Sequence, residues 1–315
     1  MRSKKGPIVD MEKRFTGLIA AVFTPMCEDG SLNLDQVPPI VEHLIRTQVS
    51  GIFVCGTTGE GPSLSSEERR ATAAVYVEAA AAKLPVMVQV GHNSLAESRV
   101  LASHAQAIGA DAISAIPPAY FKFDAIKTLV DCLVEISSAA PKLPLFYYHI
   151  PSVTGMDFDM VEFFRQAGRR LPTLAGIKFS DSAIPKFQAA AEFENRRFDV
   201  LFGSDEMLLS GLCAGATGAV GSTYNFAGPL YRRLIDAFDR GDIDEARKHQ
   251  ALSVEMLRIL CRYGIRPALK AVMKLIGLDC GPVRLPLETL TDDQLQAMKE
   301  ELGAIGFFDW ALGSV

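Results

Sequence analysis

The chain has 315 residues, of which 49% are hydrophobic and 22% are charged, and a formal net charge of −5. These values are typical of a soluble globular protein with a sizeable core, and an acidic balance without a basic stripe argues against nucleic acid as a partner. No stretch reaches the roughly 18–20 apolar residues that a membrane span needs, so we expect no membrane partner.

The cysteines and the N-terminus indicate the cellular compartment. The six cysteines include no C-x-x-C pair, and the histidines are not clustered. This pattern predicts a reduced, cytoplasmic protein without a structural zinc ion. The basic N-terminal residues are followed by Asp10 and Glu12 instead of an apolar segment, so we expect no signal peptide.

Short apolar runs alternate with longer amphipathic stretches, which is typical of βα units on a parallel sheet. The runs show little alternation, as expected for strands covered on both faces. The pattern predicts an α/β fold in which eight units close into a (β/α)8 TIM barrel over about residues 15–228. A doubly wound open sheet is the alternative, but no G-x-G-x-x-G motif follows the first run. The runs are residues 18–23, 51–55, 86–90, 112–116, 145–148, 174–178, 200–202 and 218–221.

Start and stop signals mark the helices between the runs. Ser65 and Ser94 each precede a glutamate by three residues, which is a capping-box pattern, and Gly109 and Gly215 stand where left-handed helix ends are expected. The chain after the eighth run predicts a C-terminal helical extension over about residues 229–315. Because no flexible linker precedes it, we expect residues 1–315 to form a single domain. The predicted helices of the extension are 229–240, 244–261, 266–276 and 292–302.

Lys178 is the main candidate for chemistry. It ends an apolar run and precedes Phe179, so its side chain is expected at the carboxyl end of a strand, where α/β barrels carry functional groups. Burial disfavours the charged ammonium and leaves free amine to attack a carbonyl. The alternative is a lysine that reaches from the strand end to solvent. Lys122, between two phenylalanines, is a second candidate, but we expect it to lie in a loop.

Two further polar segments coincide with ends of predicted strands. Residues 56–61 are rich in glycine and include Thr57 and Thr58, so their hydroxyls and backbone N–H groups are suited to holding a carboxylate. A plain turn is the alternative. In the fifth run, Tyr148 and His149 place a phenol and an imidazole near the barrel mouth, where aldol chemistry needs a proton carrier. Aromatic packing is the alternative there.

These segments together resemble a known family. Residues 56–60, 148–151, 176–178 and 218–222 are similar, in order and spacing, to motifs of the dihydrodipicolinate synthase / N-acetylneuraminate lyase family. The resemblance extends from about Phe15 into the C-terminal helices. As a set, the motifs are highly specific.

The resemblance implies a pyruvate-dependent class I aldolase. Lys178 would form a Schiff base with C2 of a small 2-keto acid or sugar acid, which stabilises the enamine left when the C3–C4 bond breaks. Thr57 and Thr58 would hold the carboxylate, and Tyr148 would relay the proton. Tyr120 matches a tyrosine that the family contributes across a subunit interface, in a homotetramer. No metal and no organic cofactor is then required.

The resemblance also separates two branches of the family. The synthase branch has an arginine two residues after the proline of its Tyr-x-x-Pro motif, where it meets a substrate carboxylate. Here that position is Val153, which cannot pair with a charge. The lyase branch has contacts for the polyhydroxylated tail of sialic acid, which here would be Ser180, Gly203, Asp205, Glu206 and Ser222.

The lyase branch implies reversible cleavage of N-acetylneuraminate to pyruvate and N-acetylmannosamine, and residues 147–151 and 176–181 are similar to its animal-type members. A sister aldolase for another 2-keto-3-deoxy sugar acid stays open, because Asp205 and Glu206 suit any polyol. Both residues are also explained if they only complement the dipole of a helix that begins there. The synthase activity and a non-catalytic binding role are the remaining alternatives. A binding protein is expected to lack Lys178 or Tyr148, and both are present.

Overall fold

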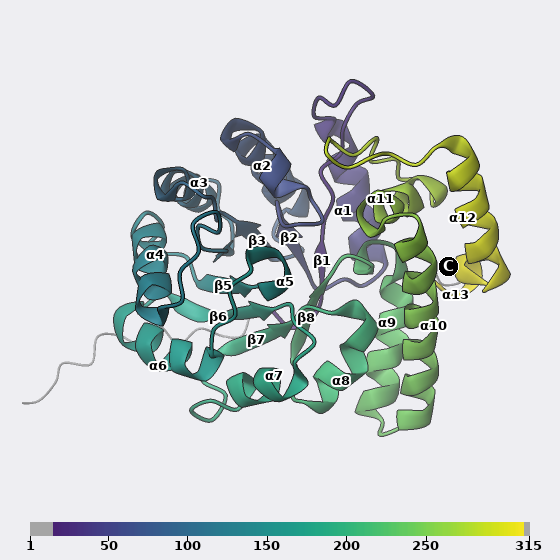
Figure 1. The fold of residues 1–315 in the computed structure, drawn as a ribbon. Coiled ribbons are helices and arrows are strands. Elements are labelled where there is room, and N and C mark those ends of the chain that lie inside the picture. Colours follow the sequence, from purple (N-terminus) through teal and green to yellow (C-terminus); the bar gives the residue numbers. More distant parts are fainter. Residues whose placement is uncertain (1–14, 312–315) are drawn as a thin grey trace, which may run out of the picture.

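The computed structural model describes residues 15–311 (Figure 1). Eight parallel strands form a closed barrel in which sequence neighbours pair and β8 pairs with β1. The predicted TIM barrel is therefore confirmed. The N-terminal residues, in which we expect no signal peptide, lie outside the described residues. The strands are β1 (Gly17–Ala21), β2 (Gly51–Val54), β3 (Val86–Gln89), β4 (Ala112–Ala115), β5 (Leu145–His149), β6 (Leu174–Phe179), β7 (Asp199–Phe202) and β8 (Gly218–Gly221).

Helices surround the barrel, and the C-terminal part of the chain adds further helices beside it. The first of these, α9, packs against both β1 and α10 (Figure 1). No helix within residues 15–311 is long and apolar enough to cross a membrane. The helices are α1 (Val37–Arg46), α2 (Ser66–Ala80), α3 (Leu95–Ala107), α4 (Ile126–Ser138), α5 (Pro151–Thr154), α6 (Met160–Arg170), α7 (Ile184–Ala191), α8 (Leu208–Cys213), α9 (Tyr224–Asp239), α10 (Ile243–Arg262), α11 (Ile265–Leu275), α12 (Asp292–Ala304) and α13 (Phe307–Trp310). Short 3-10 turns are η1 (Leu34–Gln36), η2 (Gly61–Ser63) and η3 (Asp205–Met207).

The first helix of the extension begins earlier than predicted. The sequence predicts its start at Pro229, whereas α9 starts at Tyr224 and contains a non-helical residue, Ala227, with φ −122° and ψ 22°. A proline removes a backbone hydrogen bond and its ring crowds the preceding turn, which accounts for a kink just before it. The predicted boundary therefore marks the kink inside the helix.

The helix-end signals are confirmed except at Ser94. Ser65 and Glu68 form a complete capping box at α2. At α3, the Ser94 side chain accepts from the Glu97 N–H, but the Ser94 N–H donates to His92 Nδ1, so the second half of the predicted box is wrong. Backbone φ angles are +81° at Gly109 and +97° at Gly215, the left-handed conformation expected after a helix end.

The apolar core has two parts, one on each side of the sheet. The larger part lies between the strands and the helices, and the smaller fills the barrel interior. Phe53 of β2, Phe146 and Tyr148 of β5 and Leu201 of β7 belong to the interior part. Because successive side chains on a strand point to opposite faces, Tyr147 lies in the outer part while Tyr148 faces inward.

A buried ion pair ties the loop after β2 to the C-terminal helices. Lys270 on α11 donates to Glu60 at 3.0 Å, and their side chains are only 2% and 4% exposed. The backbone N–H of Arg284 donates to the other Glu60 oxygen. Burial lowers the pKa of Lys270, and the Glu60 carboxylate opposes that shift. Glu60 therefore anchors the glycine-rich loop to the extension.

Replacing Lys270 with Met is expected to destabilise the protein by about 3–5 kcal/mol, because it leaves a buried carboxylate without its counter-ion. The midpoint of chemical denaturation measures the loss. The double variant Glu60→Gln/Lys270→Met removes both charges and should recover part of it. A single variant as stable as the parent chain would show that the pair does not hold the extension.

Candidate active site

Lys178 lies inside the barrel, in contact with two aromatic rings. Its neighbours on β6, Ile177 and Phe179, pack in the outer core, so Lys178 faces the interior and is 5% exposed. Strand register places it beside Tyr148 of β5. Lys178 Nζ is 4.2 Å from the Tyr148 ring centroid and 4.3 Å from that of Phe53. The predicted amine is therefore buried, in a position where a bound carbonyl would meet it away from bulk water.

The Tyr148 hydroxyl meets the loop after β2. Its oxygen lies 3.4 Å from Thr57 Oγ1. The ring of Tyr148 packs edge-on against Phe53, with centroids 5.6 Å apart. The phenol thus lies beside the lysine with a hydroxyl partner, as a proton relay needs.

The loop at residues 56–61 is a tight, anchored turn. The N–H groups of Glu60 and Gly61 donate back to the carbonyls of Thr57 and Gly56. Thr24, just past β1, donates to the Gly59 carbonyl at 2.7 Å. Within residues 15–311, the N–H groups of Thr57 and Thr58 have no backbone acceptor in this turn. Such free donors beside two hydroxyls suit an anionic group.

Thr58, the second threonine, meets a segment that lies far away in the sequence. Thr58 Oγ1 lies 2.6 Å from Ser222 Oγ, which follows β8. Ser180 lies beside Gly203, because a Cβ built at Gly203 would be 2.1 Å from Ser180 Oγ. The barrel thus places Thr58 next to Ser222, and Ser180 next to Gly203, at the ends of the strands.

Asp205 is buried and held in place by residues that follow β8. Its Oδ2 accepts from the Thr223 N–H at 2.8 Å and from Thr223 Oγ1 at 2.6 Å. Thr223 Oγ1 also lies 2.7 Å from the Tyr231 hydroxyl. Burial raises the pKa of Asp205, while these hydrogen bonds oppose the shift. A Cβ at Gly221 would be 1.9 Å from Asp205 Oδ1, so only glycine permits this approach.

Comparison with known proteins identifies the family. The model of the dihydrodipicolinate synthetase family matches residues 14–305. The chain belongs to this family. It is 40% identical over 304 residues to the N-acetylneuraminate lyase of Rattus norvegicus, covering 95% of each chain. It is 43% identical over 279 residues to the N-acetylneuraminate lyase of Xenopus tropicalis, covering 87% of this chain and 91% of that protein.

Solved structures of the family share the fold of this chain. The N-acetylneuraminate lyase of Proteus mirabilis superposes with a TM-score of 0.91 at 38% identity, covering 94% of this chain and all of that one. The corresponding enzyme of Aliivibrio salmonicida gives a TM-score of 0.92 at 38% identity, covering 95% and 99%. The predicted resemblance to the family, including animal members, is confirmed.

Two of the predicted site residues, Glu206 and Tyr120, lie apart from Lys178. Glu206 is exposed and lines a groove with Val254 and Arg258 of α10. Tyr120 is 77% exposed and packs edge-on against Phe121, which is 82% exposed. Within the described chain, neither side chain joins the contacts around Lys178. An exposed aromatic pair of this kind is consistent with a subunit contact.

Phe53 and Thr223 belong to the candidate site but are not among the site residues predicted from the sequence. Phe53 contacts both Lys178 and Tyr148, and its signal was only its inward position on a strand. Thr223 holds Asp205 from eighteen residues away along the chain. The contact joins the segments that follow β7 and β8, so no pattern within either segment indicates it.

Proposed function

We propose that this chain is an N-acetylneuraminate lyase that cleaves its substrate reversibly to pyruvate and N-acetylmannosamine. The observation that carries the proposal is the buried Lys178 amine, 4.2 Å from the Tyr148 ring, in a member of a family whose similar relatives are named for this activity. Val153, which is half exposed on α5, supports the lyase branch. It stands where the synthase branch has an arginine, and its apolar side chain offers no charge to a second carboxylate.

The chemistry begins with attack of the Lys178 amine on the C2 carbonyl of the open-chain keto acid. Loss of water gives a protonated imine, which withdraws electrons from the C3–C4 bond. The free N–H groups and hydroxyls of Thr57 and Thr58 bind the C1 carboxylate and fix the carbonyl beside the amine. No metal is needed for this step, because the imine itself is the electron sink.

Bond cleavage then requires a proton to leave the C4 hydroxyl. Tyr148, paired with Thr57, relays this proton as the C3–C4 bond breaks: the phenol oxygen accepts it while the phenol gives up its own O–H proton, which is the one later delivered to C3 of the enamine, and the aldehyde leaves. The enamine gains a proton at C3, and hydrolysis of the imine releases pyruvate and the free lysine. In the synthetic direction the same groups act in reverse order.

The sugar tail extends toward the ends of β6, β7 and β8. Ser180, Gly203 and Ser222 lie there, and the buried Asp205 offers an oxygen next to Gly221. Glu206 is proposed as an outer contact at the rim, because it is exposed. Hydroxyl donors of a polyol pair well with such carboxylates, whereas a second acid group is repelled.

We further propose a cytoplasmic homotetramer. All six cysteines are free, which suits a reducing compartment. Tyr120 and Phe121 form an exposed aromatic pair, and we assign Tyr120 to a neighbouring subunit's site. Residues 1–315 are proposed to act as one domain, since the Glu60–Lys270 pair joins the barrel to the extension.

Substrate comparison tests the proposed function. Pyruvate release from N-acetylneuraminate should exceed release from 2-keto-3-deoxygluconate by at least about tenfold in kcat/KM, because the tail contacts discriminate between the two chains. Pyruvate plus aspartate semialdehyde should give no cyclised product. If the shorter sugar acid is the better substrate, the Schiff-base chemistry survives but the tail assignment is wrong.

A further inference from the structure

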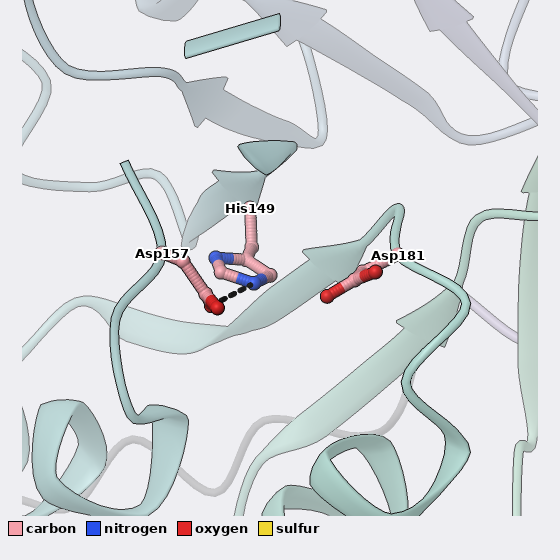
Figure 2. Close-up of side chains that lie close together, drawn as sticks. All are labelled: His149, Asp157 and Asp181. Carbon is pink, nitrogen blue, oxygen red and sulfur yellow. Dashed lines mark ion pairs between the residues drawn. The ribbon is translucent and has the colours of Figure 1, made fainter. Parts of the chain in front are cut away.

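Three potential metal ligands lie together on the outer side of β5 and β6 (Figure 2). His149 ends β5, Asp157 precedes α6 and Asp181 follows β6. One ligand atom from each lies within 4.8 Å of the other two. His149 points away from Lys178, toward the ring of Phe179 at 5.1 Å between centroids. The cluster is therefore separate from the proposed catalytic residues.

His149 is buried without a hydrogen-bond partner. Its exposed fraction is 0%, and neither ring nitrogen has a partner within the described chain. A buried polar group left unpaired is costly and rare in native proteins, and a bound ion can satisfy such a group. Figure 2 shows the ring between the two carboxylates. Nε2 is 3.8 Å from Asp157 Oδ1, too far for a hydrogen bond but close enough for both to ligate one ion.

The carboxylate of Asp157 is oriented for binding through one oxygen. Lys186 on α7 donates to Asp157 Oδ2 at 2.5 Å, which leaves Oδ1 facing His149. Outer partners of this kind commonly fix metal ligands. A buried imidazole whose ring nitrogens have no hydrogen-bond partner among the described residues can offer a lone pair to a metal ion.

We propose that His149, Asp157 and Asp181 bind one Zn²⁺ ion, with water completing the shell. An imidazole and two carboxylates suit Zn²⁺ better than Mg²⁺, which prefers oxygen ligands alone. Zn–N and Zn–O bonds of about 2.0–2.2 Å require the side chains to rotate slightly inward. The ion would join the ends of β5 and β6, the strands that carry Tyr148 and Lys178.

This proposal departs from the expectation of no structural zinc. That expectation rested on cysteine and histidine spacing, whereas these ligands come from three separate segments that only the fold brings together. The role is structural, since the imidazole faces away from the Schiff-base lysine. The reaction proposed above needs no metal and does not depend on this site.

Zinc titration of the full-length chain tests the site. After treatment with EDTA and dialysis, calorimetry with ZnCl2 should show one ion per chain, and thermal unfolding should shift upward by about 3–6 °C with excess zinc. Asp157→Asn and Asp181→Asn should weaken binding by about 10–100-fold or more. Asp159→Asn is the matched control, because asparagine keeps the cap on α6 and Asp159 lies outside the cluster.

Cobalt substitution separates this site from the exposed thiols of Cys27, Cys213 and Cys261. We expect visible Co²⁺ bands without thiolate charge transfer, lost in Asp181→Asn. MgCl2 should give no thermal shift. The proposal is overturned if zinc leaves the unfolding temperature unchanged, if both aspartate variants bind zinc as the parent does, or if the cobalt spectrum shows thiolate ligation.

Discussion

Replacing Lys178 with Met is expected to lower kcat for pyruvate release by at least about 10⁴-fold, because the imine cannot form without the amine. Methionine has a similar length and packs against Phe53 and Tyr148 without a charge, so the fold should persist. Removing this buried polar group, which has no ion-pair partner within the described chain, should leave the unfolding temperature unchanged or raise it. A coupled assay of pyruvate formation measures the loss.

Lys122→Met is the matched control for this variant. Lys122 lies in a loop, where its ammonium donates to the carbonyls of Ala119 and Thr154, as expected from the sequence. Its substitution should lower kcat far less than that of Lys178. Comparable losses in the two variants, or substantial turnover by Lys178→Met, would contradict the assignment of the nucleophile.

Tyr148→Phe is expected to lower kcat by about 10²–10⁴-fold, the usual contribution of a general acid–base group. Phenylalanine keeps the ring that contacts Phe53 and Lys178 and removes only the hydroxyl beside Thr57. Imine formation with pyruvate should therefore persist while cleavage of the C3–C4 bond fails. Borohydride trapping of the variant, compared with its steady-state rate, separates the two steps.

Tyr147→Phe is the matched control on the same strand. Tyr147 is buried in the outer core and its hydroxyl has no hydrogen-bond partner among the described residues. Its loss should leave kcat unchanged and should not reduce stability, because no hydrogen bond is removed. Equal activity of the two phenylalanine variants would rule out Tyr148 as the proton relay.

The sequence predicts the barrel well because each βα unit carries its own signal. The eight apolar runs match the eight strands to within about two residues at their ends, since buried strands need continuous apolar side chains. Lys178 is recognisable for the same reason, as a polar group in an apolar run, whereas Tyr148 is singled out only by the family resemblance. Their mutual contact follows once β5 and β6 are neighbours.

Contacts between distant segments are what the sequence does not predict. Glu60 belongs to a recognised motif, yet its partner Lys270 is 210 residues away and stands in an ordinary helical pattern. The two acidic residues after β7 look equivalent in sequence, but Asp205 is buried under Thr223 while Glu206 is exposed. Burial depends on how β7, β8 and α10 pack, which no local pattern describes.

The most direct test of the proposed mechanism is borohydride reduction in the presence of N-acetylneuraminate, followed by peptide mass spectrometry. We expect a single pyruvate-derived adduct on the peptide that contains Lys178, and none on the Lys178→Met variant. An adduct on another lysine, or pyruvate release without any trapped adduct, would contradict the Schiff-base role of Lys178.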